Sequence, residues 1–131
     1  MKGYVADIEE LTLGNDNFRQ VLYTSKEMQL VLMAIRPGEE IGEEVHDDVS
    51  QFFRFEAGEG EVWIDGVCNK VKADDVAVVP AGARHNVKSM GSEPLRLYTI
   101  YSPPEHIDGT VHKTCAEAAA AHEHFDGRTT E

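Results

Sequence analysis

Short apolar segments alternate with turn residues through most of this chain, and this pattern constrains the fold more than any other feature. The segments are rich in Val, Leu, Ile, Phe and Tyr, whereas Gly, Pro, Asp and Ser gather between them. The Asp65-Gly66 pair predicts a two-residue hairpin turn. Many short strands at near-regular spacing indicate an all-β barrel or sandwich. The predicted strands are residues 18–24, 28–36, 51–57, 61–65, 68–71, 76–79, 84–89 and 95–101. Both faces of the segment 28–36 are largely apolar, so we expect a filled interior on one side and another layer on the other.

Helical structure is expected only at the two ends of the chain. Residues 7–11 predict a short helical turn, and the Pro103-Pro104 pair prevents the last strand from continuing. Thr114 can cap a helix with Glu117 completing a capping box, and the following alanines favour a helix over residues 115–124. The expected architecture is therefore one domain over residues 1–131, with a barrel at about 18–102 and a C-terminal extension at 103–131.

Composition narrows the classes of partner. The chain has 131 residues and a formal net charge of -12, which repels phosphate backbones, so no nucleic-acid partner is expected. No apolar run approaches the ~20 residues that cross a bilayer, and the first residues lack the apolar segment of a secretory signal. We therefore expect no membrane partner and a cytoplasmic location. Cys68 and Cys115 match no redox or zinc spacing and are expected to be free thiols.

Four polar side chains are predicted to meet inside the barrel. Residues two apart in a strand face the same side, so Glu44 and His46 point together. An Asp-Asp turn then reverses the chain and brings Gln51 beside them. His85 follows a tight corner at Pro80-Ala81-Gly82.

The first of these stretches resembles a motif of the cupin family. That motif runs G-x5-H-x-H-x3-4-E-x6-G, and Gly38, Glu44, His46, Gln51 and Gly58 stand at its spacing. Two positions depart from it, because Glu44 replaces the first His and Gln51 replaces the Glu.

The second stretch resembles the other cupin motif, G-x5-P-x-G-x2-H-x3-N. Asp74, Pro80, Gly82, His85 and Ser89 stand at its positions, with Asp74 replacing the first Gly and Ser89 replacing the Asn. The resemblance implies a single jelly-roll barrel.

The resemblance also implies a mononuclear metal site. In the family, side chains at the four motif positions bind the metal, which here gives Glu44, His46, Gln51 and His85 as ligands of one divalent ion: Fe, Mn, Ni, Co or Zn. Two histidines and one carboxylate can occupy one face of a metal. Gln51 is the weakest of the four donors, and its alternative role is to hydrogen-bond a ligand. Glu44 has an alternative role as well, as a general base in a metal-free pocket, with its pKa raised by burial.

Several other side chains are assigned less specific roles. The predicted core or pocket residues are Met33, Phe53, Phe55, Trp63, Tyr98 and Tyr101. Tyr98 and Tyr101 fall on opposite faces of one strand, so one of them could face the pocket. His106 and His112 could cap the barrel mouth but are expected at the surface, and His122 and His124 are expected in solvent. Arg36 and Arg84 could meet an anionic substrate but are expected in salt bridges.

Three functions remain open at this stage. The first is metal-assisted chemistry on a small molecule, either dioxygenase-type activation or isomerase or lyase chemistry, as the cupin resemblance implies. The second is a cupin that binds a small molecule without catalysis. The third is a metal-free isomerase or epimerase that uses Glu44 as its base. The resemblance also implies a homodimer, built by pairing edge strands or packing barrel faces.

Overall fold

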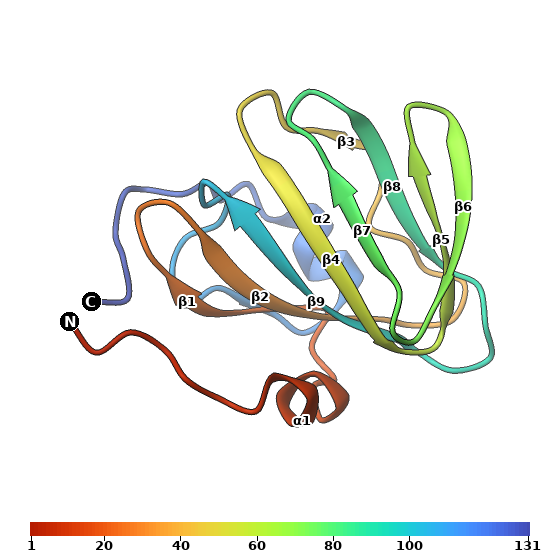
Figure 1. The fold of residues 1–131 in the computed structure, drawn as a ribbon, viewed down its shortest axis with the longest axis horizontal. Helices are drawn as coiled ribbons and strands as arrows, with labels where there is room; N and C mark the ends of the chain where they lie inside the picture. Colours follow the sequence, from red (N-terminus) through yellow and green to blue (C-terminus); the bar gives the residue numbers. More distant parts are fainter.

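Two antiparallel sheets face each other across the core in the computed structural model, which describes residues 1–131 (Figure 1). The larger sheet has six strands in the order β10-β1-β2-β9-β4-β7, and the smaller has four in the order β3-β8-β5-β6. The strands are β1 (Arg19–Thr24), β2 (Gln29–Ile35), β3 (Glu44–Val45), β4 (Ser50–Ala57), β5 (Glu59–Ile64), β6 (Val67–Lys72), β7 (Val76–Val79), β8 (Arg84–Ser89), β9 (Leu95–Ser102) and β10 (Val111–His112). The predicted all-β jelly roll with a short C-terminal helix is confirmed.

The core fills the space between the sheets. Val31 and Phe53 of the larger sheet and Val62 and Val87 of the smaller one are fully buried within a single apolar cluster. In β4, β5 and β8 the buried residue is flanked along the strand by more polar or more exposed neighbours, whereas β2 is buried on both faces. One continuous core therefore holds both sheets, and strand alternation decides which side chains reach the barrel interior.

The central strand β2 is buried on both faces, as its sequence predicted. Met33 lies in the core, whereas Leu32 and Ala34 face outward and are only 2% and 7% exposed. Helix α1 (Ile8–Leu13) packs over the outer face of β2, β4 and β9, where it forms the second layer. Asp7 caps this helix by accepting a hydrogen bond from the backbone N–H of Glu10.

The C-terminal helix is shorter than predicted. Thr114 does cap it, but α2 covers only Cys115–Ala120, and Ala121 has extended backbone. Tertiary hydrogen bonds draw the following residues away: the Glu123 carboxylate accepts from the backbone N–H of Ile107, and the Phe125 N–H donates to the Glu105 carbonyl. These bonds override the helix propensity of the alanine run.

The two ends of the chain lie side by side (Figure 1). The Glu131 carboxylate accepts hydrogen bonds from the backbone N–H groups of Lys2 and Gly3 and from the Tyr23 hydroxyl. The strand β10, which the sequence did not reveal, pairs with β1 and closes this edge of the larger sheet. Neither helix is long and apolar enough to cross a membrane.

Candidate metal centre

Strand pairing brings Glu44, His46 and His85 together. Glu44 of β3 lies directly opposite His85 of β8, so the two side chains share a face. His46, two residues after Glu44, turns the same way, and its Nε2 lies 3.0 Å from the Glu44 Oε2. The His46 and His85 ring centroids are 5.4 Å apart. One donor atom from each of the three residues lies within 4.8 Å of the others, which is close enough for a shared ion.

His85 presents a free nitrogen to this cluster. Its Nδ1 lies 3.1 Å from the Ala83 carbonyl oxygen, so Nδ1 carries the proton and donates it there. Nε2 is then left with a lone pair, and this buried atom has no hydrogen-bond partner in the protein. Such a histidine, oriented by a carbonyl at one nitrogen and bare at the other, has the form of a metal ligand.

Gln51 supplies a second bare acceptor from the other sheet. It lies on β4 opposite Tyr101 and Val79, and it is 3% exposed. Its Nε2 donates to the Thr99 hydroxyl at 3.0 Å, while the buried Oε1 has no partner. Buried acceptors are almost always paired, but Gln51 Oε1, His85 Nε2 and Ser89 Oγ are not, and the first two belong to residues at ligand positions of the motif, which calls for a ligand there. A divalent metal fits this donor set of one carboxylate, two imidazoles and one amide oxygen.

The electrostatics of the cluster follow from the Glu44–His46 contact. Burial alone would raise the pKa of the Glu44 carboxyl, but the hydrogen bond from His46 and nearby positive charge hold that pKa below its ordinary value. The same hydrogen bond raises the pKa of His46. The expectation of a raised Glu44 pKa is therefore wrong, because the hydrogen bond from His46 and the charges of His46, Arg19 and His85 together outweigh desolvation.

The cluster is partly open to solvent. The Glu44 side chain is 33% exposed, and His46 is 14% exposed. Glu105 borders the opening, with its carboxylate 3.7 Å from the His46 Nδ1. Glu44 and His46 are therefore on the more accessible side of the cluster, whereas His85 closes the inner end at 3% exposure.

Four of the six predicted core or pocket residues lie on the interior side. Met33, Phe53, Phe55 and Tyr101 are all at most 2% exposed and belong to the core. The Phe53 ring centroid lies 6.4 Å from that of His85, and the Tyr101 centroid lies 6.3 Å from that of His46. These aromatic rings form the apolar walls next to the cluster of Glu44, His46 and His85.

The structure places Tyr98 and Trp63 elsewhere. Tyr98 packs beside Phe52 on the outer face of the larger sheet. Trp63 lies on the outer face of the smaller sheet, where Lys88 stacks over its ring and Glu61 accepts from its indole N–H. Each follows a buried core residue in its strand, so alternation turns it outward.

Two histidines assigned to the surface are buried instead. His106 and His112 are each 8% exposed. His106 lies between the Tyr101 hydroxyl, 3.2 Å from its Nε2, and the Glu123 carboxylate, 2.7 Å from its Nδ1. The expected surface placement is wrong because the C-terminal segment folds back over this end of the barrel, a contact that no local pattern encodes.

The arginines divide into two groups. Arg84 forms the predicted salt bridge, 2.7 Å from Glu43, while Arg36 is exposed and unpaired. A third, Arg19, is buried near the cluster, and sequence reasoning missed it because it stands in an ordinary strand pattern.

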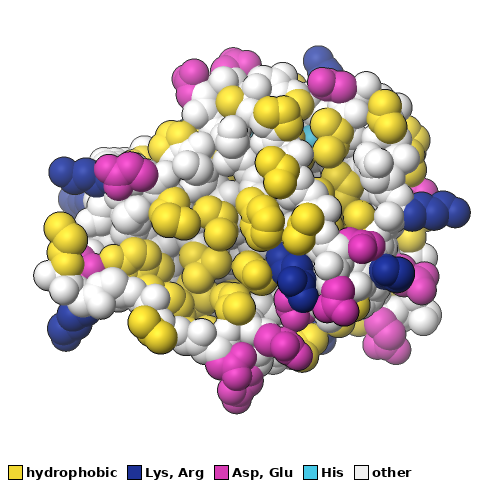
Figure 2. Space-filling view, viewed as in Figure 1, with side chains coloured by type: hydrophobic (Ala, Val, Ile, Leu, Met, Phe, Trp, Pro, Cys, Tyr) yellow, Lys and Arg dark blue, Asp and Glu magenta, His cyan; other side chains and the backbone are white.

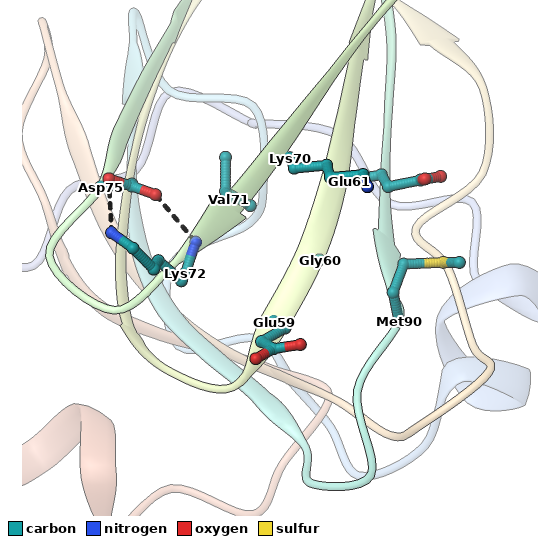
Figure 3. A pocket seen from close by; sticks show the side chains of 8 residues that line it. All are labelled: Glu59, Gly60, Glu61, Lys70, Val71, Lys72, Asp75 and Met90. Atoms are coloured by element: carbon teal, nitrogen blue, oxygen red, sulfur yellow. Dashed lines mark hydrogen bonds and ion pairs between the residues drawn. The ribbon is translucent and has the colours of Figure 1, made fainter.

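A hollow on the smaller sheet has a different character (Figure 3). Its residues are Glu59, Gly60, Glu61, Lys70, Val71, Lys72, Asp75 and Met90. Lys72 is tied to Asp75, which accepts from its backbone N–H at 2.9 Å and lies 3.7 Å from its ammonium. The hollow contains none of the metal-cluster residues and no histidine or cysteine, so we do not assign the function to it.

The comparison with protein families settles the class of this fold. The family model described as "Cupin domain" matches residues 31–101, more than half of the chain. The protein is a cupin. The matched region holds all four predicted ligands.

The chain is similar to other proteins over most of its length. The Bacillus subtilis (strain 168) protein YrkC is 44% identical over 126 residues, covering 92% of this chain and 68% of YrkC. A protein of Acanthamoeba polyphaga mimivirus is 37% identical over 120 residues, covering 82% of this chain and 70% of that protein. The crystal structure of BH2720 from Bacillus halodurans has a TM-score of 0.90 and 42% identity, covering 92% of this chain and 96% of BH2720.

The structure explains how this cupin tolerates one departure from the family motif. Asp74 stands where the motif has glycine and takes the positive φ of 76° that glycine would adopt. Asp and Asn tolerate this region better than other residues, and the Asp74 carboxylate accepts from Arg54 at 2.9 Å. The motif glycine at Gly58 is retained, and there a Cβ would lie 2.5 Å from the Pro94 carbonyl oxygen.

Proposed function

We propose that this cupin binds one divalent metal through Glu44, His46 and His85, with Gln51 as a fourth donor, and uses it on a small molecule. The observation that carries the proposal is the pair of buried, unpartnered acceptors at His85 Nε2 and Gln51 Oε1. These atoms belong to residues at two of the family's ligand positions, and the other two positions supply the Glu44–His46 pair. Leaving such acceptors unpaired costs free energy unless a ligand occupies them.

The side chains around the metal have separable roles. When bound, the ion acts as a Lewis acid toward a substrate carbonyl or hydroxyl. Phe53 and Tyr101 exclude water from the inner side, while the opening beside Glu44 admits the substrate. Because the Glu44 pKa is held below its ordinary value, its carboxylate is a weak proton acceptor and suits a ligand better than a base. The hypothesis of a metal-free isomerase or epimerase is therefore less favoured.

Two classes of chemistry fit the proposed site, and oxygen separates them. A dioxygenase-type reaction consumes O₂ and requires a redox-active ion such as Fe(II). Isomerase or lyase chemistry proceeds anaerobically and accepts several divalent ions. Turnover assays under air and under argon, with Fe(II), Mn(II) and Zn(II) in turn, distinguish the two. A protein that binds the small molecule but turns over nothing with any ion is the non-catalytic alternative.

Calorimetric titration tests the proposed metal site. Protein treated with EDTA and dialysed is titrated with Co(II) and Zn(II), and we expect a single site per chain. Glu44→Ala, His46→Ala and His85→Ala should each weaken binding at least about tenfold, while His124→Ala, whose side chain is 80% exposed, should bind like the wild type. Equal affinity in all four variants would exclude this ligand set.

We also propose that the protein forms a homodimer through the outer face of the larger sheet. Figure 2 shows apolar side chains gathered over β2, β9, β4 and β7. On this face Val76 and Val78 are 53% and 62% exposed, and Phe52 and Tyr98 are half-buried beside them. A two-fold symmetric contact buries the same apolar patch on both copies, so a dimer removes from water the exposed apolar face of an otherwise acidic protein. Light scattering should show a dimer that Val78→Lys disrupts and Val67→Lys, on the other sheet, leaves intact; a monomeric wild type would refute it.

A further inference from the structure

Arg19 is a buried arginine that pairs with no carboxylate. It begins β1, where it lies opposite Met33 of β2 and His112 of β10, so its side chain faces the barrel interior. It is only 6% exposed, and no carboxylate oxygen lies within 4.0 Å of its guanidinium. The arginines that do form ion pairs are Arg54, Arg84, Arg96 and Arg128.

The contacts of Arg19 leave part of its guanidinium unused. The Arg19 Nη1 donates to the His112 Nδ1 at 3.2 Å, and the guanidinium carbon Cζ of Arg19 lies 5.4 Å from the Phe18 ring centroid. Its Nε is buried without an acceptor. Arginine stays charged at any physiological pH, so this arrangement encloses a positive charge and a free N–H donor inside the barrel. A buried arginine with a purely structural role would be expected to form an ion pair with a carboxylate.

Arg19 and the cluster of Glu44, His46 and His85 both face the barrel interior. Tyr101 lies beside the cluster, because its ring packs edge-on to that of His46, and the positive charge of Arg19 acts on its hydroxyl. The Tyr101 hydroxyl is held in place by His106, whose Nε2 lies 3.2 Å from it. The positive charge of Arg19 also acts electrostatically on Glu44 and His46, where its own effect lowers both pKa values.

We propose that Arg19 anchors a small monocarboxylate that spans from this guanidinium, past Tyr101, to the metal ligands. A guanidinium presents parallel N–H donors that match a carboxylate, and the bare Nε is one of them. The carboxylate would also need a neighbouring hydroxyl or carbonyl oxygen to face the metal, so the expected class is a small hydroxy- or keto-acid. The metal half of this inference rests on the proposed function, whereas the Arg19 half does not.

Charge on the surrounding residues favours a monoanion. Glu44, Glu105 and Glu123 are all near enough to interact electrostatically with the same interior groups. A dianion such as phosphate would meet more repulsion from these carboxylates than a single carboxylate would. Inorganic phosphate therefore serves as the discriminating probe.

The test uses lactate, pyruvate, lactamide and inorganic phosphate as probes in calorimetry and thermal unfolding, on metal-free and Zn(II)-loaded protein. We expect lactate or pyruvate to bind, and lactamide and phosphate to bind at least about tenfold more weakly. Arg19→Met should weaken lactate binding at least about tenfold, Arg19→Lys should weaken it less, and Arg36→Met, which removes an exposed and unpaired charge, should have no effect. Zn(II) affinity should not fall in Arg19→Met, because a positive charge has been removed near the ion.

Each contrary result has a definite meaning. The inference is overturned if neither acid binds the wild type, if lactamide or phosphate binds as tightly, or if Arg19→Met binds lactate normally. If Arg19→Met does not fold, the comparison of lactate with lactamide on the wild type decides the question. Metal binding without any carboxylate binding refutes this inference and leaves the proposed function standing. Lactate binding that depends on Arg19 in a protein that takes no metal refutes the proposed function instead.

Discussion

Gln51 and Gln29 make a matched pair of buried glutamines that separates a ligand from a structural residue. Gln29 is fully buried and satisfied: its amide donates to the Thr24 hydroxyl and the His106 carbonyl, and its oxygen accepts from two backbone N–H groups. Gln51 makes one hydrogen bond, to Thr99, and keeps its oxygen unpaired. The same Gln→Leu substitution should therefore act differently at the two positions.

In metal-free protein, Gln51→Leu should be nearly neutral. It removes an unpaired acceptor that costs about 1–3 kcal/mol, but it leaves the buried Thr99 hydroxyl without its hydrogen-bond partner, at a similar cost of about 1–3 kcal/mol. The expected change in the free energy of unfolding therefore lies within about 2 kcal/mol of zero. Gln29→Leu strands several buried backbone groups and should cost about 3–5 kcal/mol.

Bound metal adds a second effect of the Gln51→Leu substitution. If Gln51 is a donor, its loss weakens metal affinity, and each tenfold loss lowers the stabilisation by saturating metal by about 1.4 kcal/mol. Urea unfolding of both variants, with EDTA and with excess Zn(II), measures these differences. A Gln51→Leu protein that is at least about 3 kcal/mol less stable without metal, as expected for Gln29→Leu, and that gains as much from Zn(II) as the wild type, would show that Gln51 is structural and that its bare oxygen is no ligand.

Two further predictions concern the C-terminal segment and the barrel turns. Burial alone would raise the pKa of Glu123, but its hydrogen bond with His106 holds that pKa below its usual value. The ionised carboxylate therefore stabilises the fold above about pH 4.5, and this stabilisation is lost as pH falls through the lowered pKa. In Glu123→Gln, urea unfolding should lose that part of the acid dependence and about 1–3 kcal/mol at neutral pH; an unchanged pH profile would contradict the assignment. Gly58→Ala should cost more than about 2 kcal/mol, because φ is 88° and the new Cβ would meet the Pro94 carbonyl at 2.5 Å. Gly42→Ala, at φ 102° with nothing within 4 Å, should cost only about 1 kcal/mol; equal losses would exclude the steric explanation.

The barrel could be predicted from the sequence because its determinants are local. The Asp65-Gly66 turn, with φ of 46° and 83°, has the left-handed conformation that its residues favour. Strands 76–79 and 84–89 begin and end where the turn residues indicated. Alternation likewise placed Glu44 and His46 on one side, and the structure brings both to His85.

What could not be predicted depends on contacts between distant segments. The burial of His106 requires the segment after α2 to return over the barrel, and the strand β10 requires β1 as its partner. The orientation of Trp63 and Tyr98 depends on which phase of the alternation faces the core, and aromatic residues fit either side. Arg19 gave no signal because an arginine at the start of a strand is ordinarily solvent-exposed.

Elemental analysis of protein purified without chelator tests the metal site most directly. We predict about one divalent ion per chain in the wild type and in His124→Ala, and far less than one in Glu44→Ala, His46→Ala and His85→Ala. An ion that is equally abundant in all five proteins, or a wild type that holds none even after dialysis against Co(II) or Zn(II), would contradict the claim that these side chains converge to bind a metal.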